Sequence, residues 1–176
     1  MSRPRSALLP LPGASPPLSL TFDPALSQLR DLKPADLDAL VSRWFLTLGL
    51  THVRVRERRP GLTTYQAMLG PAPLSTPFQV RIYQRQNKLQ VHHVDAFVGY
   101  LTRTGVPSGL LITTGGWSQP ARLIAGGVAS RRVGLLSGEE WTAALADARA
   151  GVTCRRLWRW IVDLAGTGKT PPRRSP

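Results

Sequence analysis

The chain has 176 residues, with 23 lysines and arginines against 10 aspartates and glutamates, and a formal net charge of +13. This length allows one domain with a sizeable core, and no apolar run approaches the roughly 20 residues of a membrane span. A single cysteine, Cys154, excludes an internal disulfide framework and a cysteine-based zinc site, and it fits a reducing cytoplasm. The positive charge favours nucleic acid as a partner, with general solubility as the alternative explanation.

The first part of the chain predicts an arm, a helix and a strand. Residues 1–22 are basic and proline-rich and predict a disordered arm. From Pro34, apolar residues recur every three or four positions, which predicts a helix that ends at Gly49. Residues 51–58 then alternate between valine and arginine, which predicts a half-buried strand with a basic outer face formed by Arg54, Arg56 and Arg58.

Two turns separate this strand from two more. Pro60-Gly61 leads into a predicted strand at residues 63–69, and a turn at residues 70–73 leads into a third at 77–84, so the three form an antiparallel meander. Side chains alternate along a strand, so those of the third strand divide between two faces. One face receives Phe78, Val80 and Ile82, and the other receives Gln79, Arg81 and Tyr83.

The rest of the chain alternates helices with short strands. Helices are predicted at residues 93–104 and 118–125 and from the capping box Ser137-Gly138-Glu139-Glu140 through residue 148, with strands at 110–114 and 133–136. A basic amphipathic helix is predicted at 151–165 and a disordered basic tail at 166–176. This order predicts an α/β fold, a three-layer sandwich around a central mixed sheet, plus a C-terminal helix.

Four segments in this order resemble the Mrr-type restriction endonuclease domain of the PD-(D/E)xK nuclease superfamily. They are the end of the first helix at Leu48-Gly49-Leu50, the strand Gln79-Val80-Arg81-Ile82-Tyr83, and the segments at residues 111–121 and 135–141. The resemblance implies a restriction-endonuclease-like domain with an αβββαβαβ core over residues 30–150. It also implies DNA cleavage with a metal ion, held by an aspartate of the second strand and by the glutamine or acid of the third. A lysine two residues further on would stabilise charge at the phosphate.

The sequence departs from that pattern at the catalytic positions. The family's aspartate falls near Thr64 or Tyr65, its lysine is replaced by Arg81, and no aspartate or glutamate occurs between Glu57 and Asp95. A divalent cation such as Mg²⁺ prefers carboxylate oxygens, and arginine is too basic to accept a proton. We therefore predict a DNA-binding pseudonuclease that needs no cofactor.

Two alternatives remain open. An active enzyme would need Mg²⁺ and acids that have moved to new positions; Asp38 with Gln79 is then the best pair, Arg81 a residual catalytic position and Asp95 a displaced metal ligand. The chain could instead be a protein-interaction module or the subunit of a homodimer. For the DNA-binding hypothesis, we expect sequence-independent contacts with the phosphate backbone from eight arginines: Arg54, Arg56, Arg58, Arg81, Arg85, Arg155, Arg156 and Arg159.

Overall fold

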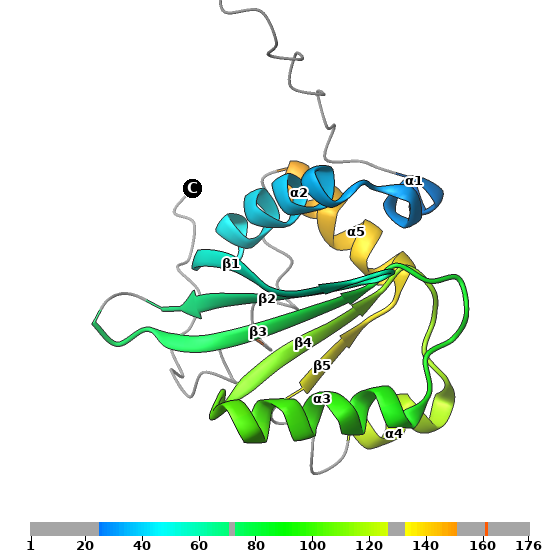
Figure 1. Cartoon of the computed structure of the whole chain (residues 1–176). Helices are drawn as coiled ribbons and strands as arrows, with labels where there is room; N and C mark the ends of the chain where they lie inside the picture. The colour runs from blue at the N-terminus through cyan, green and yellow to red at the C-terminus, as the bar shows by residue number, and fades with distance from the viewer. Residues whose placement is uncertain (1–24, 71–72, 127–132, 151–160, 162–176) are drawn as a thin grey trace, which may run out of the picture.

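A computed structural model of the chain describes residues 25–70, 73–126, 133–150 and 161. After a short first helix, the element order is the one expected from the sequence, as the ribbon shows (Figure 1). In chain order the elements are α1 (Leu26–Asp31), α2 (Pro34–Thr47), β1 (Leu50–Arg59), β2 (Leu62–Leu69), β3 (Thr76–Tyr83), α3 (Val91–Thr104), β4 (Ser108–Thr113), α4 (Gln119–Gly126), β5 (Val133–Leu136) and α5 (Gly138–Arg149).

The five strands form one mixed sheet in the order β1-β2-β3-β4-β5. Strands β1, β2 and β3 are antiparallel neighbours, and β4 and β5 continue the sheet parallel to β3. Helices α1, α2 and α5 lie on one face of the sheet, and α3 and α4 lie on the other (Figure 1). The predicted α/β sandwich of three layers is therefore confirmed.

The core on the α2 side is built from the apolar stripe expected from the sequence. Pro34 occupies the first turn of α2, where its missing N–H leaves no hydrogen bond unmade, and the helix ends before Gly49, whose φ is 72°. Trp44 of α2 packs against Trp141 of α5, with ring centroids 6.2 Å apart. This contact joins the two helices over the same sheet face.

Strand β3 has the two faces predicted for it. Phe78, Val80 and Ile82 belong to the core beneath α2 and α5, whereas Tyr83 belongs to the second core beneath α3 and α4. Because side chains alternate, Gln79 and Arg81 point toward the α3 layer with Tyr83. The polar side chains of Gln79 and Arg81 therefore lie in a layer covered by helices.

Two local features tie the sequence to these elements. At the start of α5, Ser137 Oγ accepts a hydrogen bond from the Glu140 N–H at 3.3 Å, and Glu140 accepts one from the Ser137 N–H at 2.7 Å, which confirms the predicted capping box. Helix α1 was not predicted, because six residues with one buried leucine, Leu29, give too little periodicity to detect.

Several predictions fall outside the described part of the chain. These are the arm at residues 1–22, the tail at 166–176, and all of the predicted helix at 151–165 except Ile161, which is helical and buried in the α2-side core. Arg155, Arg156 and Arg159 also lie outside it. No helix within the described residues has the length and apolar character needed to cross a membrane.

Candidate functional site

The pair Gln79 and Arg81 lies on one face of β3, as predicted, but both residues are buried. Gln79 is 2% exposed and Arg81 8% exposed. The Oε1 atom of Gln79 has no hydrogen-bond partner among the described residues. An orphaned buried oxygen is uncommon in folded proteins, so this cluster is a candidate functional site.

Arg81 is held in place from three directions. Its Nε donates a hydrogen bond to Thr64 Oγ1 at 3.2 Å, and its terminal nitrogen lies 3.6 Å from a carboxylate oxygen of Glu57. The guanidinium carbon lies 5.4 Å from the ring centroid of Phe97 and 4.9 Å from that of Tyr100, both on α3. Cation–π attraction and the ion pair stabilise the charge in a layer that water reaches poorly.

Glu57 is the residue of this cluster that was not predicted. It pairs with Thr64 across β1 and β2, and Thr64 pairs with Arg81 across β2 and β3, so the three lie in one row. Its side chain is 26% exposed and also lies 2.7 Å from Arg59. Counting back through the Pro60-Gly61 turn could have found it, since the tight turn sets Arg59 opposite Leu62 and therefore Glu57 opposite Thr64.

The residues present do not fit the metal ion that the resemblance implies. The row offers one carboxylate, and that carboxylate already faces two arginines, Arg59 and Arg81. Within the described ranges no three histidine, cysteine, aspartate or glutamate residues come together as a possible metal site. The guanidinium of Arg81 would also repel a divalent cation at this position.

Asp38 lies on the other face of the sheet from Gln79. Both of its carboxylate oxygens are 2.7 Å from the same terminal nitrogen of Arg58, and Tyr65 donates a hydrogen bond to it at 2.7 Å. Tyr65 belongs to the core beneath α2. The prediction that Asp38 and Gln79 form a pair is therefore wrong, because the sheet separates them.

This arrangement changes the acid–base behaviour of Tyr65. Burial, followed by the hydrogen bond to Asp38 and the negative charge of that carboxylate, raises the pKa of the Tyr65 hydroxyl far above its usual range. Asp95, the other proposed metal ligand, is exposed on α3 and has no hydrogen-bond or ion-pair partner in the described structure. Neither Asp38 nor Asp95 joins the Gln79 cluster.

The arginines of β1 divide between the two faces of the sheet. Register shifts interrupt the pairing of β1 with β2, between Thr51 and Arg54 and again between Val55 and Glu57. Arg54 and Arg56 both donate hydrogen bonds to Gln66 Oε1, whereas Arg58 reaches Asp38 on the α2 side. The prediction that all three share one face is wrong, because a bulge adds a residue and reverses the alternation.

Further basic side chains surround the β1–β2 turn. Arg59 is 72% exposed and belongs, with Arg54, Arg56 and Arg58, to the basic patch for which the sequence favours phosphate contact. Arg85 and Lys88 are exposed in the segment after β3. The side chain of Arg85 lies over the turn, since a Cβ added at Gly61 would be 3.8 Å from its Nε. Arg59, at the end of β1, and Arg85, after the end of β3, therefore lie at the same end of the sheet.

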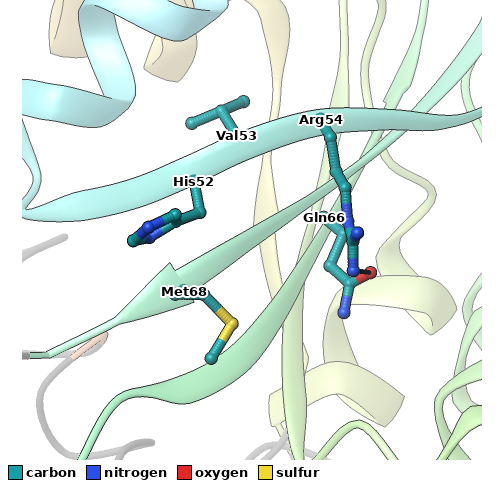
Figure 2. A pocket seen from close by; sticks show the side chains of 5 residues that line it. All are labelled: His52, Val53, Arg54, Gln66 and Met68. Atoms are coloured by element: carbon teal, nitrogen blue, oxygen red, sulfur yellow. Dashed lines mark hydrogen bonds between the residues drawn. The ribbon is translucent and has the colours of Figure 1, made fainter. Parts of the chain in front are cut away.

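A groove lies beside Arg54 at the other end of the β1–β2 hairpin. Its cavity volume is about 470 Å³, and it is lined by His52, Val53, Arg54, Gln66 and Met68. Figure 2 shows Arg54 beside Gln66, with His52 and Met68 directed to the same side of the hairpin and Val53 directed to the opposite side. Sequence reasoning did not predict this groove.

Comparison with known families now identifies the class of the domain. Residues 29–145 match the Mrr_cat family model, described as a restriction endonuclease. The chain belongs to this restriction endonuclease family, as the sequence resemblance predicted. No curated protein gives a significant match.

Three solved structures are similar to this chain at low identity. The DNA modification-dependent restriction endonuclease AspBHI is 17% identical, with 94% of this chain and 45% of that chain covered and a TM-score of 0.48. The MspJI restriction endonuclease in complex with a 27-mer oligonucleotide is 22% identical, with 93% and 42% covered and a TM-score of 0.45. The restriction endonuclease FokI is 15% identical, with 81% and 29% covered and a TM-score of 0.46. The chain thus spans less than half the length of each solved chain that it matches.

Proposed function

We propose that this domain binds the phosphate backbone of DNA through Arg54 and Arg56 and does not cleave it efficiently. The observation that carries the proposal is that both guanidinium groups converge on one neutral acceptor, Gln66 Oε1. Neither arginine has a carboxylate partner among the described residues. Two like charges brought together repel each other, and a phosphate with several acceptor oxygens would relieve that repulsion.

Family membership supports DNA as the source of that phosphate. Arg85 is exposed beside the turn at the far end of the same hairpin and would extend the contact along a nucleic-acid strand. Arg58 and Arg59 contribute less, because their charges are already compensated by Asp38 and Glu57. Contacts of this kind are sequence-independent and weaken as salt rises.

The site around Arg81 supports binding without efficient cleavage. Hydrolysis by a metal-dependent nuclease needs a metal ion that activates water. Here Thr64 pairs with Arg81, the family's aspartate is expected near Thr64 or Tyr65, and the single carboxylate of this row, Glu57, faces two arginines. We therefore propose that the domain needs no metal cofactor. Arg81 itself is buried, so we assign it to holding this cluster together rather than to a direct phosphate contact.

The binding test uses the double variant Arg54→Glu/Arg56→Glu in the full chain. Affinity for labelled DNA at low salt should fall at least roughly tenfold, and the dependence on salt should become shallower by about one unit per lost phosphate contact. The matched control is Lys33→Glu/Arg103→Glu, which changes the net charge equally at two exposed positions, the N-cap of α2 and the last turn of α3. Equal losses in both variants would show that net charge, rather than this arginine pair, drives binding.

The cleavage test incubates supercoiled plasmid with the full chain in Mg²⁺ or Mn²⁺. We expect the plasmid to stay intact. Metal-dependent nicking that is lost in Glu57→Gln would overturn the proposal and would identify Glu57, beside Thr64 and Gln79, as an acid that has moved to a new strand. Cleavage of this kind would favour the active-nuclease alternative, with a different acid from the Asp38 that the sequence suggested.

A further inference from the structure

The groove beside Arg54 has the size of a small-molecule site. Its volume of about 470 Å³ lies within the range of about 300–1,000 Å³ that is usual for such sites. It adjoins the arginine pair directly, because Arg54 and Gln66 contribute to both. A ligand with a phosphate on the arginines would therefore place its neighbouring group in the groove.

The backbone of β1 is distorted where it forms this groove. The register of β1 against β2 shifts between Thr51 and Arg54, so His52 and Val53 lie in an irregular segment. His52 has φ of 52°, a left-handed conformation that is unfavourable for residues other than glycine. Bulges and strained residues are concentrated at functional sites, where they redirect side chains. Here the distortion turns the imidazole toward the side of the hairpin that carries Met68 (Figure 2).

The lining groups suit a nucleobase. The His52 ring offers a flat surface for stacking, and the thioether of Met68 is apolar and polarisable. Gln66 uses its Oε1 atom for the two arginines, while its amide nitrogen has no hydrogen-bond partner in the part of the chain described. That nitrogen can donate to an acceptor atom on the edge of a base.

We infer that this groove binds one unpaired nucleobase whose adjacent phosphate is held by Arg54 and Arg56, so that the domain prefers single-stranded DNA over duplex. The inference rests on the proposed backbone binding. A base within a duplex has its faces covered by stacking and its edge paired, so it cannot enter the groove. An unpaired base gains stacking on the protein while its phosphate makes the same ionic contacts.

The experiment compares three labelled probes of equal length at one salt concentration: a single-stranded oligothymidine, an abasic strand with the same phosphodiester backbone, and a duplex. The full chain should bind the oligothymidine between roughly fivefold and 150-fold more tightly than the abasic strand, the range expected for stacking of one base. It should also bind the duplex more weakly than the oligothymidine.

The outcomes separate the two proposals. Equal affinity for the oligothymidine and the abasic strand would overturn the base site and leave the backbone binding intact. Tighter binding of the duplex would also overturn the base site. Failure to bind any of the three probes at low salt would overturn the proposed function itself.

Two variants locate the effect in the groove. His52→Gly removes the ring and tolerates the left-handed backbone, and Met68→Ala shortens the opposite wall. Each should bring the ratio between oligothymidine and abasic affinity close to one while affinity for the abasic strand stays constant. Leu46→Ala, an exposed position on α2 across the sheet, should keep the wild-type ratio. Wild-type ratios in both groove variants would refute the assignment.

Discussion

Removing Glu57 should destabilise the fold more than removing its partner Arg81. Arg81 is buried beneath α3, and Glu57 is the carboxylate that compensates its charge. Glu57→Ala leaves a buried guanidinium without that carboxylate. Arg81→Met instead removes the buried charge, fills a similar volume with an apolar chain, and leaves Glu57 paired with the exposed Arg59.

The magnitudes follow from the geometry. At a separation of 3.6 Å and an effective dielectric constant of about 20, the gross attraction between the two charges is roughly 5 kcal/mol. Breaking a fully buried pair by removing one partner costs about 3–5 kcal/mol. Glu57 is partly solvated, so we expect about 2–3 kcal/mol for Glu57→Ala. Arg81→Met should cost about 1 kcal/mol, chiefly from the lost hydrogen bond to Thr64.

Urea denaturation of both single variants and of the double variant measures these free energies of unfolding. The double variant should be more stable than Glu57→Ala alone, because it no longer contains a buried unpaired charge. Arg59→Ala is the control, and it should change stability by less than about 1 kcal/mol since that ion pair is exposed. The reasoning fails if Arg81→Met costs as much as Glu57→Ala, or if the two effects simply add.

Two further predictions concern opposite layers of the sandwich. The raised pKa of Tyr65 means that the unfolded chain releases this proton above about pH 10 while the folded chain keeps it, so stability should be fully present below that pH and fall above it. Tyr65→Phe should make the alkaline loss of stability shallower in urea titrations between neutral and alkaline pH; an unchanged slope would contradict the assignment. Gly109→Ala should destabilise the protein by about 1–3 kcal/mol, because the added Cβ would lie 2.6 Å from both the Gln79 carbonyl oxygen and Phe97 Cζ. A thermal midpoint equal to that of the wild type would show that α3 can shift to make room.

The overall architecture was predictable because it depends on local patterns. The apolar spacing from Leu37 to Leu48 identifies a helix with one buried face, and the alternation along β3 assigns each side chain to a layer. The glycine after α2 and the serine before α5 fix the ends of those helices through backbone geometry and capping. Each signal is contained within a few neighbouring residues.

The site was less predictable because it depends on contacts between distant segments. The register shifts between β1 and β2 cannot be predicted from the sequence of β1 alone. Simple alternation of side chains along the strand therefore predicted Arg58 on the same face as Arg54 and Arg56. The resemblance suggested Asp38 and Gln79 as a pair, yet the sequence does not show that a sheet lies between them. The covering of Arg81 by α3 likewise depends on how a later helix packs, through Phe97 and Tyr100.

Strand β1 is the outermost strand of the sheet formed by the described residues, so one of its rims carries backbone groups that no neighbouring strand pairs. Such a rim can recruit a strand from a second copy of the chain. Here the two register shifts bend the rim. If two copies joined along it, the positively charged stretch from Arg54 to Arg59 of one copy would also repel the same stretch of the other. We therefore expect that any homodimer of this domain joins through a helical surface and not by continuing the sheet from one molecule into the next.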